Sequence, residues 1–216
     1  MTSLRRLHPG RWGNRTLLAA AAGLLVVALR GPLWYTRMES PQYRGEEALQ
    51  VVVYADRIDG DLREIGTLNK YIGVRMPEHF PELRATSWVL GFLLVLALVV
   101  LASPSAVRQK AAVALFALML LALAGGGVLL QNRLHQLGHE RDHSIMVGVS
   151  DFSPPVFGTA KIANFTVRAG LEYGAWAFLA ASLLTGWAAF AGKGNSPSRL
   201  QKEKAKTCCA ELVSPR

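Results

Sequence analysis

Long apolar blocks, separated by short charged stretches, dominate the pattern of the sequence. Such blocks lie at residues 16–35, 86–103, 111–130 and 169–192. A bilayer core about 30 Å thick needs about 20 mainly apolar residues in a helix. The pattern therefore predicts four membrane-spanning helices. It differs from the finer helix or strand periodicity that is typical of a soluble fold.

The first apolar block has an alternative interpretation as a cleavable signal peptide, because basic residues precede it. No small-x-small cleavage site follows the block, and Arg30, Pro32 and Trp34 stand where such a site would lie. We therefore expect an uncleaved helix. In this helix the Arg30 side chain extends toward the headgroups, and Trp34 and Tyr35 lie at the membrane interface.

Small residues in the last two blocks predict close contacts between helices. Gly125, Gly126 and Gly127 lie in the third block, and Gly170 and Gly174 form a GxxxG pattern assigned to the fourth. Small side chains let helix backbones approach each other closely. Packing within one bundle is favoured over a dedicated dimer face.

The first polar segment, residues 36–85, contains the pattern of a folded unit. Residues 49–54 are rich in β-branched side chains and predict a strand. Asp59 and Gly60 indicate a turn, after which Asp61 is placed to cap a short helix that ends at Gly73. The apolar face of this helix consists of Leu62, Ile65, Leu68 and Ile72.

The second polar segment, residues 131–168, begins with a predicted continuation of the third helix over residues 131–143. An irregular stretch follows, in which two prolines exclude a regular helix and Phe152, Val156 and Phe157 need cover. We expect these side chains to pack on the helix of the first segment, because about fifty residues are too few for an independent core. The expected partner-docking residues are Tyr71, Ile72, Phe152, Pro154, Pro155 and Phe157.

The expected fold class is an all-α membrane protein, with four transmembrane helices and a small mixed extracytoplasmic module formed by two loops.

The net charge is +9, but the basic residues flank the apolar blocks and form no single basic face, so nucleic-acid binding is not expected. The N-terminal arm holds four basic residues, the turn at 104–110 holds two and the tail at 193–216 holds six. The two polar segments have nearly balanced charge, which predicts a bacterial inner-membrane protein with both termini cytoplasmic. The expected parts are a basic arm (1–15), spans at 16–35, 86–103, 111–130 and 169–192, outer segments at 36–85 and 131–168, a turn at 104–110 and a disordered basic tail (193–216).

Histidines spaced along the predicted extension of the third helix are the clearest candidate chemistry. His135, His139 and His143 recur at intervals of four and share one face, and an i, i+4 pair can share a metal ion. A solvated polar helix end is the alternative. Imidazole and thioether suit copper. The candidate copper ligands are His135, His139, His143, His79, Met76 and Met146.

The polar segments resemble a poorly characterised family of bacterial four-span membrane proteins. Five stretches carry the resemblance: residues 40–43, 60–65, 68–73, 152–159 and 162–165. That family is associated with gene neighbourhoods for the maturation of nitrous oxide reductase, a periplasmic copper enzyme. The resemblance covers nearly the whole chain in layout, while its specific motifs are confined to the two polar segments. It implies an accessory role in copper handling or in the assembly of that enzyme.

The sequence also departs from the family pattern. Lys70 and Val74 stand where the family favours His and Met, whereas His139 and Asp142 match it. Any ligands at the first two positions are therefore missing from this chain, and Met76 and His79 lie close enough to replace them.

Two other functions are open at this stage. A membrane scaffold would dock a partner through the outer segments without binding metal. A transporter would need polar residues at mid-membrane depth, and Glu172 is the only acid assigned to a span. An enzyme is not expected, since the sequence has no nucleophile elbow, phosphate loop or zincin motif. Cys208 and Cys209 lie in the basic tail. Two interpretations of this pair are open: reduced thiols without a ligand, or a binding site for a soft metal.

Overall fold

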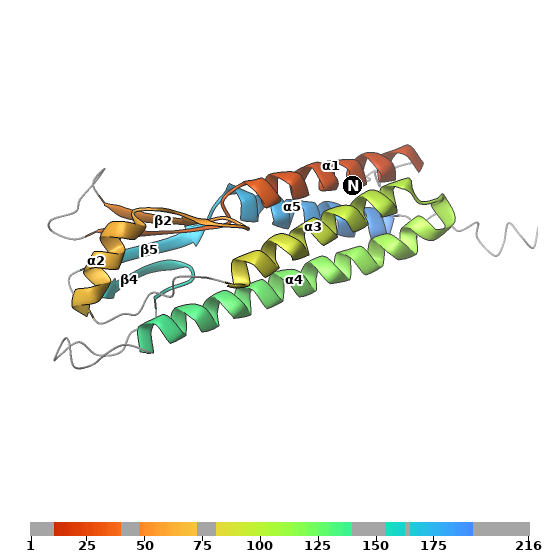
Figure 1. The fold of residues 1–216 in the computed structure, drawn as a ribbon. Helices are drawn as coiled ribbons and strands as arrows, with labels where there is room; N and C mark the ends of the chain where they lie inside the picture. Colours follow the sequence, from red (N-terminus) through yellow and green to blue (C-terminus); the bar gives the residue numbers. More distant parts are fainter. Residues whose placement is uncertain (1–10, 40–47, 73–80, 140–153, 163–164, 192–216) are drawn as a thin grey trace, which may run out of the picture.

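The computed structural model describes residues 11–39, 48–72, 81–139, 154–162 and 165–191. Figure 1 shows four long helices side by side and a small sheet at one end of the bundle. The turn between the second and third long helices lies at the opposite end.

The long helices are α1 (Arg11–Arg30), α3 (Pro81–Ala102), α4 (Ser105–His139) and α5 (Tyr173–Ala191). Each contains a stretch long and apolar enough to cross a membrane, so the prediction of a multi-pass membrane protein is confirmed at this level. Helix α4 has 35 residues. At about 1.5 Å per residue it is longer than a bilayer core is thick, so its last turns extend beside the sheet.

Small side chains allow the helices of the bundle to pack closely. Helix α5 lies against both α1 and α4, and the alanines Ala28 of α1 and Ala181 of α5 are fully buried in the shared core. The buried hydroxyls of Ser182 and Thr185 donate to carbonyl oxygens one turn earlier, at 2.9 and 2.8 Å. These polar groups are thus satisfied within their own helix, as an apolar environment requires.

The sheet contains five antiparallel strands in the order β3-β2-β1-β5-β4. Strand β1 (Trp34–Glu39) pairs with β5 (Phe165–Leu171) from Trp34↔Leu171 to Glu39↔Thr166. Because β1 belongs to the first polar segment and β5 to the second, their ladder joins the two segments into one module. The other strands are β2 (Leu49–Val53), β3 (Ile58–Gly60) and β4 (Gly158–Ile162).

The prediction of a small mixed module formed by two segments is therefore confirmed in part, and the label all-α is too narrow. The strand predicted at residues 49–54 corresponds to β2. Strands β1 and β5 extend into residues that the sequence assigned to spans. Trp34 and Tyr35 are the first residues of β1, and Gly170 lies in β5. The expected GxxxG pair of Gly170 and Gly174 thus does not lie on one helix.

One face of the sheet is covered by two helices. Near the bundle, Trp34 and Ala169 pack with Leu134 of α4, and the Trp34 indole N–H donates to the carbonyl oxygen of Val156 at 2.7 Å. At the far end, Leu49 and Val51 pack with Ile65, which is 2% exposed. Ile65 belongs to α2 (Leu62–Ile72), which lies across the end of the sheet away from the bundle (Figure 1).

Helix α2 begins after Asp61, as predicted, but the Asp61 side chain accepts from strand β2. The carbonyl oxygen of Asp61 accepts the N–H of Ile65 at 3.0 Å, while its carboxylate accepts the N–H of Gln50 at 2.9 Å. The described apolar side chains of α2, Leu62 and Ile65, pack on the sheet. The side chains of Leu68, Ile72 and Phe152, which complete the expected contact with the proline-containing stretch, lie outside the described part of the structure, so that contact stays a prediction. Phe157, one of its expected partners, is 70% exposed. Gly73, the predicted end of α2, lies outside the described residues.

Two glycine predictions also need correction. Gly125, Gly126 and Gly127 have no atom of another part of the described structure within 4 Å of an added Cβ, so they make no close contact with any of the described helices. Gly60, which the sequence placed in a turn, is the last residue of strand β3. Its φ is +117°, and an added Cβ there would meet the Gln50 carbonyl oxygen.

Candidate functional site

Two of the predicted histidines lie together at the end of α4. The rings of His135 and His139 are 3.9 Å apart between centroids and inclined by 40°, and both residues are exposed. Nδ1 of His139 lies 2.9 Å from the carbonyl oxygen of His135. Among the described residues, Nδ1 of His139 is thus engaged, and Nε2 is the nitrogen that would face a ligand. The i, i+4 spacing therefore produces the shared face that the sequence predicts.

The rest of the predicted copper set is not placed. Met76, His79, His143 and Met146 lie outside the described residues. Within the described residues, no group of three or more His, Cys, Asp or Glu side chains is arranged to hold a metal ion. The described part of the chain thus supplies two imidazoles, a donor set that suits copper but is incomplete for most metal sites.

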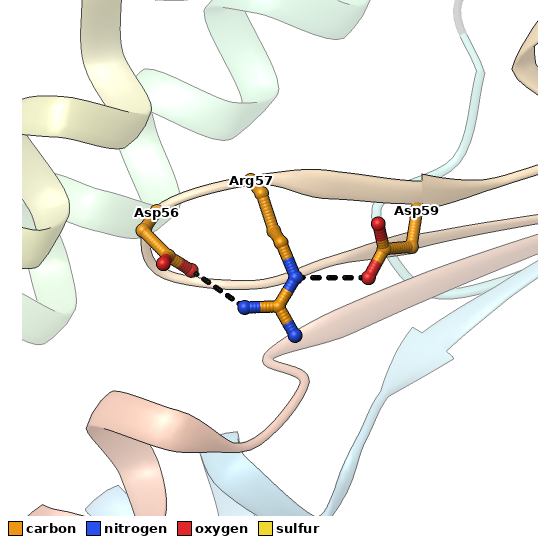
Figure 2. A network of polar contacts seen from close by, with 3 residues as sticks. All are labelled: Asp56, Arg57 and Asp59. Atoms are coloured by element: carbon orange, nitrogen blue, oxygen red, sulfur yellow. Dashed lines mark hydrogen bonds and ion pairs between the residues drawn. The ribbon is translucent and has the colours of Figure 1, made fainter.

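A charged cluster fastens the turn between β2 and β3. Arg57 donates from Nε to Asp59 at 2.9 Å and from Nη1 to Asp56 at 3.3 Å, as Figure 2 shows. Its guanidinium carbon lies 4.2 Å from the ring centroid of Tyr54. The hydrogen bond to Asp59 raises the pKa of Arg57 above its usual value. Ala55, in the same turn, is fully buried in the core of the bundle, so this turn joins the sheet to the helices.

The face of the sheet that α2 and α4 do not cover carries polar and charged residues. Arg37 and Arg168 are directly opposite each other on β1 and β5. Both lie within ion-pair distance of Glu39, at 3.5 and 3.8 Å. Lys161 is paired with Thr166, which is itself opposite Glu39, so Lys161 faces the same side. Three basic groups therefore share this face with the carboxylate of Glu39.

An open hollow of about 340 Å³ lies where this face meets the start of α5. Its polar lining includes Tyr35, Thr159 and Arg168, and its apolar lining includes Phe157 and Trp176. Gly170 is part of its lining, and an added Cβ there would lie 2.9 Å from the ring of Tyr35. The hollow thus has a polar half toward the sheet and an apolar half toward the bundle.

The predicted docking residues do not form one cluster among those described. Phe157 lines the hollow at the bundle end of the sheet, while Pro154 and Pro155 are half-buried in the chain that leads to it. Tyr71 and Ile72 are the last residues of α2, at the other end of the module. The position of Phe152 lies outside the described residues.

Sequence reasoning missed Tyr35, Thr159, Arg168 and Trp176. The available signal was the alternation of polar and apolar residues in residues 34–39 and 165–171. Each of these stretches adjoins an apolar block, so part of each was assigned to a membrane span.

Comparison with models of known protein families and with curated proteins gives no match for this chain.

Proposed function

We propose that this chain is a non-enzymatic accessory protein of the bacterial inner membrane, which presents its sheet module to a periplasmic copper enzyme or to the maturation factors of that enzyme. The observation that carries the proposal is the β1–β5 ladder, which builds one sheet from two distant segments. A sheet held by backbone hydrogen bonds and seated on a helical bundle is a rigid platform. The resemblance to a family associated with nitrous oxide reductase maturation supports the choice of partner.

The distribution of charge supports the proposed orientation. The first turns of α4 carry Arg108 and Lys110, at the end of the bundle opposite the sheet. The start of α1, with Arg11 and Arg15, belongs to that same end, because α1 runs from there to β1. Basic residues near span ends favour the cytoplasmic side. In this orientation the sheet module lies in the periplasm, where the enzyme is assembled.

Transport is a weaker account of the same structure. No Asp or Glu lies in any candidate span of the described residues. These spans are 13–30, 83–102, 107–136 and 173–191. Glu172 lies before α5, and its carbonyl oxygen accepts the N–H groups of Ala175 and Trp176. The acid that the sequence assigned to a span therefore lies at its entrance, where it complements the helix N-terminus.

A complementation experiment tests the accessory role. A source strain that lacks the gene should accumulate nitrous oxide reductase with a reduced copper content, and the wild-type chain should restore it. The variant Ile65→Asp, which places a charge in the sheet core, should not restore it. Thr67→Asp, which adds the same charge at an exposed position of α2, should. Full copper content in the strain without the gene would contradict the proposal.

Transient copper binding is a second candidate function, and the adjacent rings of His135 and His139 favour it. Two imidazoles of one helix face are suitable donors for Cu(I), and the undescribed residues Met76 or Met146 would supply a thioether. We expect purified protein in detergent to bind close to one equivalent of Cu(I) under reducing conditions. The double variant His135→Ala/His139→Ala should bind much less.

The matched control for that titration is Gln136→Ala, which changes an exposed side chain on the same turn of α4. It should leave copper binding intact. Stoichiometric binding by the double histidine variant would place the site elsewhere, such as at Cys208 and Cys209. If wild-type protein binds no copper, the docking scaffold without metal is the better account.

A further inference from the structure

The hollow between the sheet and α5 lies at a defined depth if α5 crosses a membrane. Strand β5 ends at Leu171 and α5 begins at Tyr173, so the sheet joins the span almost directly. Tyr173 and Trp176, in the first turn of α5, are 59% and 56% exposed. Tyrosine and tryptophan are enriched at the level of the lipid headgroups. The hollow therefore opens at the boundary between the headgroups and the acyl chains.

The polar half of the hollow favours an anion. Arg37 and Arg168 are direct cross-strand neighbours, an arrangement in which like charges destabilise a sheet. Glu39 supplies one negative charge to both, and its contact with Arg168 is long, at 3.8 Å. Thr159 is the partner of Arg168 on β4, so its hydroxyl belongs to the same lining. Among the described residues of this face, three basic groups accompany one carboxylate. Guanidinium and hydroxyl groups are suitable donors to a phosphate.

The apolar half of the hollow favours a ligand with a hydrocarbon part. Leu171 and Trp176 line it from the side of the span, and Phe157 lines it from the turn before β4. Phe157 is 70% exposed, and together with Leu171 and Trp176 it forms the apolar part of the lining.

From this arrangement we infer that the hollow binds one anionic phospholipid of the leaflet on the side of the sheet. The headgroup phosphate is held by Arg168 and Thr159, with the Tyr35 hydroxyl on the third side, and the first carbons of an acyl chain lie on Leu171 and Trp176. A free phosphate ester shares the headgroup chemistry but would leave the apolar half empty. This inference does not rest on the proposed docking or copper-binding roles, although Phe157 is also one of the expected docking residues.

The test is a titration of delipidated protein in detergent with phosphatidylglycerol, with the bound lipid counted by native mass spectrometry. Wild-type protein should retain one lipid with higher affinity than it shows for phosphatidylcholine. Arg168→Ala should weaken this binding about tenfold, the effect expected when a charged hydrogen-bond donor is lost. Thr159→Val should weaken it by a smaller factor. Arg63→Ala is the control, because it removes an exposed arginine of α2 at the far end of the module.

Each outcome decides the inference. Loss of binding in Arg168→Ala and Thr159→Val, with Arg63→Ala unchanged and the melting temperatures preserved, supports the lipid site. Equal affinity in wild type and Arg168→Ala overturns it. An equal loss in Arg63→Ala also overturns it, because the effect is then general attraction between charges. If inorganic phosphate or glycerol phosphate displaces the lipid at similar concentrations, the site is a simple anion site and the lipid assignment is wrong.

Discussion

At the scale of single residues, Gly60 sets the connection between the sheet and α2. Its φ of +117° lies in a region that side chains with a Cβ rarely adopt, and an added Cβ would meet the carbonyl oxygen of Gln50. The same Gln50 carbonyl accepts the N–H of Asp61 at 2.9 Å. The glycine therefore permits the close approach that places Asp61 at the start of α2.

Replacement of this glycine should be costly. Gly60→Ala should lower the free energy of unfolding of the sheet module by about 1–3 kcal/mol, because it combines backbone strain with a collision. The measurement is the resistance of the module to protease as urea is increased, with the protein held in detergent micelles.

The control is Gly66→Ala in α2, where an added Cβ meets no atom within 4 Å. That change should be neutral or stabilise by about 0.5–1 kcal/mol, since alanine is the better helix former. Equal resistance of Gly60→Ala and wild type would mean that the turn is not held in the described conformation.

The histidines illustrate how far single residues could be predicted. The spacing of His135 and His139 was sufficient to place both rings on one face, because a helix repeats at nearly four residues. Spacing gave no information about the hollow. Tyr35 and Arg168 are separated by more than 130 positions in the sequence and meet only through the β1–β5 ladder.

At the scale of elements, α2 is held by a small apolar contact. Ile65 is 2% exposed and packs on Leu49 and Val51, with Leu62 and Ile58 partly buried beside them. A carboxylate in place of Ile65 would be buried among these side chains without a partner. Ile65→Asp should therefore destabilise the docking of α2 by roughly 3 kcal/mol or more.

Amide hydrogen exchange with mass spectrometry checks this prediction. Residues 49–53 and 62–72 should lose protection in Ile65→Asp, while 34–39 and 165–171 keep theirs, because β1 and β5 form their own ladder beside α4. Thr67→Asp should exchange like wild type. If protection is lost across all five strands, α2 is part of a single cooperative unit with the whole sheet.

The elements that sequence reasoning found and missed differ in a physical way. Strand β2 and helix α2 were predicted because a run of valines and a helical apolar repeat stand apart from the spans. Strands β1 and β5 were missed because they join α1 and α5 through only three residues and one residue. A window long enough to detect a span includes such adjoining residues. The two spans were therefore placed a few residues too far toward the sheet.

At the scale of the whole molecule, the chain divides into an apolar bundle and a polar module. The outer surface of the bundle carries large apolar side chains, including Phe92, Val95, Leu121 and Leu183, all more than 45% exposed. An apolar surface of this extent in water would be an aggregation hazard, whereas in a bilayer it contacts lipid. The basic residues at one end of the bundle and the sheet at the other give the molecule a polarity across the membrane.

That polarity predicts the outcome of reporter fusions. Alkaline phosphatase folds only outside the cytoplasm, so fusions after Lys70 in α2 and after Gly158 in β4 should be active, and a fusion after Gly194 should be inactive. Green fluorescent protein at the same three positions should give the reverse pattern. The physical reason is the excess of Lys and Arg in the short segments, since the basic residues of these segments resist transfer across the membrane. Replacement of Arg108 and Lys110 by Ala leaves two basic segments on that side and should keep the pattern. An active phosphatase after Gly194, with inactive fusions in the sheet, would put the module in the cytoplasm and remove the ground for a periplasmic partner.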